Sequence, residues 1–230
     1  MPNKLKIGVI LSGSGVYDGS EIHESVLTLL AIDQQGAQAI CFAPNIKQHH
    51  VINHLNGNEM DEERNVLIES ARIARGDVKD LKDFNVNDID ALVIPGGFGA
   101  AKNLSKWAFA GHKGEIDIDV KHAIVSTFEQ KKPIGAMCMG PTVIAKALAD
   151  KELGQKITVG NVTSASHYNI SEISNGMNKL GADTQMAEAY EVVVDHNYKI
   201  VSSPCYMMQA SIAMINEGIA QTVKNVIALA

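Results

Sequence analysis

The chain has 230 residues, of which 46% are hydrophobic and 20% are charged, and its formal net charge is −6. This length suits a single domain, residues 1–230, with enough apolar side chains for a buried core. No apolar run approaches the roughly 20 residues of a membrane-spanning helix, and an acidic chain without a basic block argues against a nucleic-acid partner.

The three cysteines, Cys41, Cys138 and Cys205, lie far apart and lack the spacing of a metal site. Such sparse, odd-numbered cysteines are typical of a protein that keeps its thiols reduced, so we predict a cytoplasmic location. The short apolar stretch after the basic N-terminus ends in Gly-Ser-Gly, which favours a first strand over a signal peptide.

Strand and helix patterns alternate from the start of the chain. A β-branched run over 6–13 predicts a buried strand. Ser20, followed by acidic residues, predicts the beginning of a helix, and Gly36 predicts its end. One apolar stripe, the pattern of a core-facing helix side, runs along this helix; its members are Ile22, Val26, Leu29 and Leu30.

The alternation continues to the end of the chain. Strands are predicted over 37–44, 89–99, 133–138 and 156–160, and helices over 119–132, 140–150, 171–182 and 206–230. Residues 45–85 form an insertion with a helix over 63–76, and residues 191–204 form a hairpin that turns at His196-Asn197. This order predicts an α/β protein whose mostly parallel sheet is covered by helices on both faces.

Sites in such sheets form at the carboxyl ends of the strands, which here are followed by the loops 13–20, 95–103 and 138–141. Cys138 lies in "GAMCMGPTVIA", on a tight turn between a strand and a helix. Such a turn exposes the side chain above the sheet, strains the backbone to positive φ, and places a helix N-terminus where it favours a thiolate. The alternative is a buried cysteine that packs as a small apolar group.

Two further segments carry candidate groups. Gly96 and Gly97 in "PGGFGAAKN" let backbone amides approach a ligand and form an oxyanion pocket, or they form only a tight turn. Glu24 in "SEIHE" is placed to meet Cys138, and the repulsion between two anions would leave one of the pair protonated, so that Glu24 could shuttle protons. The alternative is a surface glutamate. His23 is a weaker candidate base, and His54 and His167 are weaker still.

Two of these motifs resemble a known family. "PIGAMCMGP" and "LVIPGGFGAAKNL" resemble the nucleophile elbow and glycine loop of the PfpI-type, class I glutamine amidotransferase-like superfamily. "GVILSGSGVYDGSEIHE", "CFAPN", "VINHL" and "ARIARG" resemble its ElbB branch, the enhancing lycopene biosynthesis proteins, also called isoprenoid biosynthesis proteins with amidotransferase-like domain. The resemblance runs nearly end to end and is weakest over 160–190.

The resemblance implies a flavodoxin-like three-layer α/β sandwich, a homodimer, and a glutathione-independent glyoxalase (a lyase) that needs no metal or organic cofactor. Its substrates would be small reactive aldehydes: glyoxal, converted to glycolate, or methylglyoxal, converted to lactate. The resemblance assigns Cys138 as the reactive cysteine with Glu24 as its carboxyl partner, and it places amides around Gly97 and Met139 at the sulfur. To these we add His23 as a catalytic helper and Gly96 as a further oxyanion- or substrate-binding residue.

The chain departs from its superfamily at two points. Glutamine amidotransferases carry a His-Pro-Glu segment where this chain has Ser203-Pro204-Cys205, and PfpI proteases place a histidine where it has Met139. Glutaminase and protease activities are therefore excluded. A redox or electrophile sensor built on Cys138 remains the alternative function. Nucleotide binding is rejected because the first loop lacks the third glycine of the dinucleotide-binding motif.

Overall fold

The computed structural model of the protein describes residues 4–230; the first three residues of the predicted domain lie outside them. Its centre is a seven-stranded sheet in the order β3-β2-β1-β4-β5-β9-β8, in which every pairing is parallel except that of β8 with β9. The strands are β1 (Lys6–Ile10), β2 (Gln38–Ala43), β3 (Val78–Asp80), β4 (Ala91–Ile94), β5 (Ile134–Met137), β8 (Val193–Asp195) and β9 (Ile200–Ser203).

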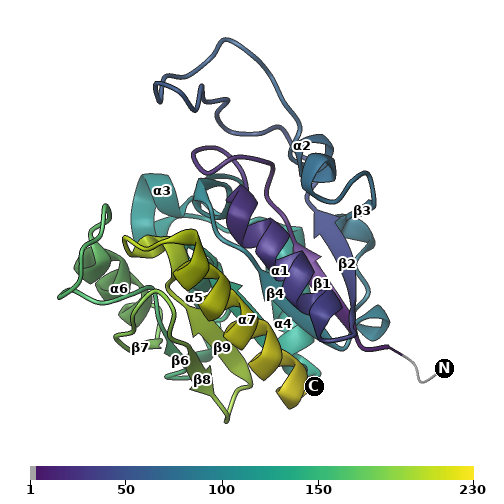
Figure 1. Ribbon diagram of the computed structural model, residues 1–230, viewed down its shortest axis with the longest axis vertical. Helices are drawn as coiled ribbons and strands as arrows, with labels where there is room; N and C mark the ends of the chain where they lie inside the picture. Colours follow the sequence, from purple (N-terminus) through teal and green to yellow (C-terminus); the bar gives the residue numbers. More distant parts are fainter. Residues whose placement is uncertain (1–3) are drawn as a thin grey trace.

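Helices cover both faces of this sheet, which confirms the predicted α/β fold class. Figure 1 shows α1 and α7 side by side on one face, with α4 and α5 behind the sheet. A second, two-stranded sheet and α6 flank β8 and β9. The remaining bounds are α1 (Ile22–Gln34), α2 (Val66–Ile73), α3 (Trp107–Ala110), α4 (Ile118–Glu129), α5 (Gly140–Ala147), β6 (Lys156–Ile157), α6 (Ile170–Asn178), β7 (Asp183–Thr184) and α7 (Ile212–Leu229). None of the helices within residues 4–230 is long and apolar enough to cross a membrane.

Three predicted elements differ in the structure. The predicted strand over 156–160 shrinks to β6 and pairs with β7 outside the main sheet. The final helix begins only at Ile212, after a single 3₁₀ turn at Cys205–Met207, because the Ser211 side chain caps it. The insertion contains β3, a strand too short for its sequence pattern to reveal.

The apolar stripe predicted to face the core is the fourth difference. Ile22, Val26 and Leu30 are each more than two-fifths exposed. The helix instead buries a face of smaller and polar side chains: Glu24, Ser25, Thr28, Ala31 and Ile32. Small side chains allow α1 to lie close to α7 and β2, so close packing decides the orientation of this helix.

The core between α4 and the sheet provides a test of the fold. Ile124 is completely buried on α4, whereas Ile118 at the start of the same helix is 79% exposed. We expect Ile124→Ala to lower the free energy of unfolding by about 2–5 kcal/mol, because it removes apolar contacts and leaves a cavity. Ile118→Ala is the control and should change it by roughly 0.5 kcal/mol or less, measured by denaturant unfolding. Equal effects of the two changes would contradict the placement of α4.

Candidate active site

The three loops singled out in the sequence meet at the carboxyl edge of the sheet. Beside β1 and β4, the Phe98 N–H donates to the Val16 carbonyl at 2.8 Å, and the Gly99 N–H donates to the Gly19 carbonyl at 2.8 Å. Because β1 is followed by β2 on one side and paired with β4 on the other, this is the point where the strand order reverses, the usual place for a site in an open α/β sheet.

Cys138 sits on the turn that leads from β5 into α5. Its φ is +55°, which confirms the predicted strained turn. Its own N–H donates to the Ser203 carbonyl on β9 at 3.1 Å, so that the turn is fixed to the neighbouring strand. The N–H groups of Gly97 and Met139 donate hydrogen bonds to the buried Cys138 sulfur. The sulfur therefore lies in a nest of two backbone donors.

Glu24 reaches the same place from the first turn of α1. Its carboxyl group is completely buried and hydrogen-bonded to the Cys138 side chain. Its two oxygens also accept backbone N–H groups: Oε2 from Gly96 at 3.1 Å and Oε1 from Tyr206 at 3.1 Å. Glu21 caps α1 by accepting the Glu24 N–H at 2.7 Å, which holds this first turn in place. The structure thus joins Glu24 and Cys138, as the sequence led us to expect.

Burial controls the protonation of this pair. Burial, and secondly the nearby Glu21 carboxyl, raise the pKa of Glu24 to about 8. The pKa of Cys138 is raised as well, by burial and then by Glu24. We expected the helix N-terminus to lower the pKa of Cys138 and favour a thiolate, but burial and Glu24 outweigh this effect. Glu24 keeps its proton at neutral pH and the Cys138 thiol keeps its own, so the Gly97 and Met139 amides face a thiolate only when the pair loses a proton.

Gly96 touches both members of the pair. A Cβ on this residue would lie 2.6 Å from Glu24 Oε2 and 2.8 Å from the Cys138 sulfur, and closer still to the Cys138 Cβ. The neighbouring Gly97 has a φ of +98°, a conformation that favours glycine. Gly96 binds Glu24 through its N–H, whereas Gly97 binds the sulfur. The two adjacent glycines therefore have separate parts in the site.

This geometry predicts the effect of a single methyl group. We expect Gly96→Ala to separate Glu24 from Cys138, and to lower stability by about 1–3 kcal/mol, as overpacking of a buried site does. Any activity that depends on the pair should be largely lost even at temperatures where the variant is still folded. The measurements are the rate of the reaction proposed below and thermal unfolding of the same sample. A variant with unchanged activity would contradict the contact at Gly96.

His23 is not among the groups that bind the sulfur. It lies on the exposed side of α1, where its Nδ1 is 2.9 Å from the Tyr206 hydroxyl. Tyr206 in turn binds Glu24 through its backbone N–H. His23 is thus connected to the site only through Tyr206. His54 and His167 also lie in other contacts, His54 with Tyr17 and His167 with Gln209.

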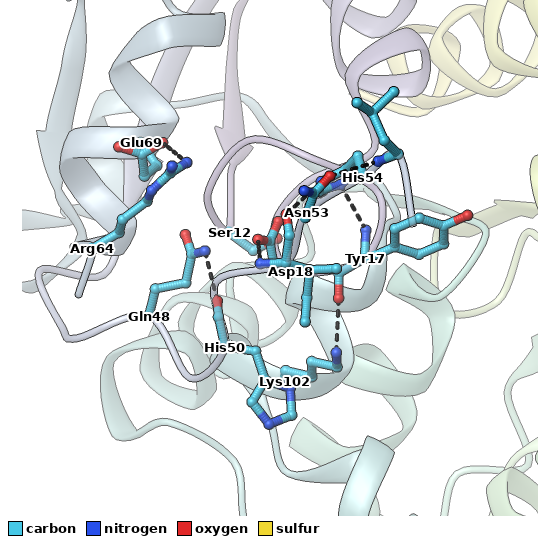
Figure 2. A network of polar contacts seen from close by, with 12 residues as sticks. Ser12, Tyr17, Asp18, Gln48, His50, Asn53, His54, Arg64, Glu69 and Lys102 are labelled. Carbon is cyan, nitrogen blue, oxygen red and sulfur yellow. Dashed lines mark hydrogen bonds and ion pairs between the residues drawn. The ribbon is translucent and has the colours of Figure 1, made fainter. Parts of the chain in front are cut away.

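The insertion has a structural role that its sequence did not reveal: it holds the loop before α1. Figure 2 shows the polar network between them. The Ile52 N–H donates to Asp18 Oδ2 at 2.7 Å, and the Tyr17 N–H donates to His54 Nε2 at 3.2 Å. From the glycine loop side, Lys102 Nζ donates to the Tyr17 carbonyl at 2.8 Å. These contacts fix the loop from which Glu21 and Glu24 follow.

A groove of about 1050 Å³ opens next to Met139, and Cys138 and Glu24 are not part of its lining. Met139, the residue after the cysteine, lines it together with aromatic side chains that include Phe98, Trp107 and Tyr168. Burial and the nearby Cys138 raise the pKa of Tyr168 to about 12, so its hydroxyl keeps its proton beside the site. Tyr168 lies in the segment where the family resemblance is weakest, and only the folded chain brings it here.

Comparison with known proteins places the site in context. A model of the DJ-1/PfpI family matches residues 68–219. The human "Glutamine amidotransferase-like class 1 domain-containing protein 3, mitochondrial" is 38% identical over 97% of this chain and 83% of its own length. The solved structure of an isoprenoid biosynthesis protein with amidotransferase-like domain from Ehrlichia chaffeensis is 35% identical, with a TM-score of 0.87 over 98% of this chain and 99% of that one.

A more distant structure shares the fold alone. Glyoxalase III from Candida albicans has a TM-score of 0.61 over 98% of this chain and 97% of its own, at 16% identity.

The predicted cytoplasmic location is contradicted by these relatives. The human protein is named as mitochondrial. So is the "ES1 protein homolog, mitochondrial" of Rattus norvegicus, which is 37% identical over 98% of this chain and 84% of the rat protein. The prediction was wrong because it rested on cysteine usage, and reduced thiols indicate a reducing environment without identifying the compartment.

Proposed function

The chain belongs to the DJ-1/PfpI family, and on that premise we propose that it is a glutathione-independent glyoxalase of the ElbB branch. The observation that carries the proposal is the buried contact between the Cys138 thiol and a Glu24 carboxyl that keeps its proton. The full-length similarity to the Ehrlichia isoprenoid biosynthesis protein supports the branch. The presence of a glyoxalase III with this fold supports the reaction class.

The first step uses the thiol and the amides around it. The Cys138 sulfur attacks the aldehyde carbon of glyoxal or methylglyoxal as its proton leaves, and a hemithioacetal forms. Charge that develops on the aldehyde oxygen is stabilised by backbone N–H groups of the nest, with Gly97 and Met139 as the donors. Glu24 delivers its proton to this oxygen and the thiol proton passes to water, which completes the addition.

The second step moves a proton between two carbons. Glu24, ionised after giving up its proton, removes the hydrogen from the carbon bound to sulfur while water adds a proton to the neighbouring carbonyl oxygen, which gives an enediol. Glu24 then returns a proton to the neighbouring carbon, and the hydroxyl group on the sulfur-bearing carbon loses its proton to water and becomes the thioester carbonyl. The product is a thioester of the hydroxy acid, which water hydrolyses to glycolate or lactate and the free thiol. The Gly96 and Tyr206 amides hold the carboxyl in place during both transfers. His23 fixes the Tyr206 ring and transfers no proton in this scheme.

The test is turnover by the purified protein without glutathione. We expect methylglyoxal to disappear with the formation of an equal amount of lactate, at a rate that neither glutathione nor a metal chelator changes. Dependence on glutathione would overturn the proposal, since the thiol would then come from the solvent. Consumption of the aldehyde without lactate would indicate simple adduct formation instead of catalysis.

A further inference from the structure

Cys205 is a second buried thiol that the proposed reaction does not use. It is completely buried, and its φ of +46° places it, like Cys138, in a conformation that residues other than glycine rarely adopt. The two cysteines directly follow paired strands: Met137 of β5 is opposite Ser203 of β9, and the Cys138 N–H binds the Ser203 carbonyl at 3.1 Å. Cys138 therefore lies one residue beyond the Met137–Ser203 pair, and Cys205 lies two residues beyond it.

The contacts of Glu24 join the two thiols further. Glu24 is hydrogen-bonded to the Cys138 side chain and accepts the N–H of Tyr206, the residue after Cys205. Burial and the Glu24 carboxyl raise the pKa of Cys205, and Cys205 is itself among the neighbours that raise the pKa of Cys138. The Cys205 sulfur also lies 3.7 Å from the hydroxyl of Ser203, the residue whose carbonyl accepts the Cys138 N–H.

We propose that Cys138 and Cys205 form a redox pair, in which a peroxide oxidises Cys138 and Cys205 then closes a disulfide. In the first step the Cys138 thiolate attacks the outer oxygen of hydrogen peroxide, the O–O bond breaks, and Cys138 sulfenic acid and hydroxide form. In the second step the Cys205 sulfur displaces the hydroxyl group from Cys138. The Cys205 proton leaves with that hydroxyl as water, and Glu24 is placed to relay it.

The disulfide would protect Cys138 from irreversible oxidation. A sulfenic acid without a partner thiol reacts with more peroxide to give sulfinic acid, whereas a disulfide is restored by a reducing thiol. The pair would also stop aldehyde chemistry while oxidised, because it occupies the sulfur. The disulfide does not depend on the proposed glyoxalase function, because it is inferred only from the positions of Cys138 and Cys205.

The experiment treats the folded protein with a small excess of hydrogen peroxide, blocks the remaining thiols and maps the cysteines by mass spectrometry. We expect the wild type to lose two hydrogens and to yield a peptide pair linked through Cys138 and Cys205, with Cys41 still free. Dithiothreitol should restore all three thiols. Cys205→Ala at the same peroxide dose should instead gain two oxygens on Cys138, and dithiothreitol should not remove them.

Cys41→Ala is the matched control, because Cys41 is also buried but lies in β2, away from the pair. It should form the disulfide as the wild type does. Sulfinic acid on Cys138 in the wild type, with Cys205 still free for alkylation, would overturn the proposal. Cys205→Ser guards against misfolding of the alanine variant, and its Cys138 should be oxidised in the same irreversible way.

Discussion

Cys138→Ser should abolish the consumption of methylglyoxal, with a loss of roughly 10³-fold or more. The sulfur is the nucleophile in the proposed reaction, and a serine hydroxyl in the same nest is far less acidic and less nucleophilic than a thiol. The N–H donors of Gly97 and Met139 would remain, but they stabilise charge and do not form the bond to the aldehyde. The measurement is lactate formation at saturating methylglyoxal.

The controls separate chemistry from folding. Serine is smaller than cysteine and can keep the positive φ of the turn, so the thermal unfolding of Cys138→Ser should be close to that of the wild type. Cys41→Ser should retain wild-type activity, since the residue lies in β2, away from Glu24 and the glycine loop. A folded Cys138→Ser variant with undiminished turnover would show that the aldehyde reacts elsewhere.

Glu24→Gln should lower the rate by about 10²–10⁴-fold, the usual contribution of a positioned acid or base. The amide can still hydrogen-bond the Cys138 sulfur, but it cannot take up and return a proton. Only one of its two terminal atoms can accept an N–H, whereas Glu24 accepts those of both Gly96 and Tyr206. The activity must therefore be compared at a temperature where unfolding shows both proteins to be folded. Activity within a few-fold of the wild type would remove Glu24 from the mechanism.

The same variant tests the protonation of Glu24 without any substrate. The pKa of Glu24 is raised from 4.5 to about 8, so between these pH values the folded protein holds a proton that the unfolded chain releases. Stability from this group is complete below pH 4.5 and is lost as the pH rises to 8. The wild type should lose stability relative to Glu24→Gln by up to about 1.4 kcal/mol per pH unit in this window. A constant difference between the two would contradict the raised pKa.

The sequence predicted the sheet and its loops because each strand and helix there has a clear local pattern. The buried runs ending at Ile94 and Met137 are followed within two residues by Gly96 and Cys138, so order along the chain was enough to place them at one edge. The turn at Cys138 was predictable for the same reason. The single-domain boundary and the homodimer stay predictions.

What the sequence could not predict depends on packing between distant segments. The exposed stripe of α1 has the same periodicity as a buried one, and only the close contact with α7 decides which face turns inward. The raised pKa of Cys138 depends on burial by several loops, which outweighs the local effect of a helix N-terminus. Cys205 and Tyr206 join Glu24 only through the pairing of β5 with β9.

Conversion of methylglyoxal in deuterated water tests the central claim, that Cys138 and Glu24 move a proton between adjacent carbons without glutathione. Proton NMR of the product should show lactate, with deuterium at its hydroxyl-bearing carbon in those molecules for which the Glu24 carboxyl exchanged its proton with the solvent before returning it. Lactate that Glu24→Gln forms as fast as the wild type, or no lactate from the wild type at all, would contradict the account.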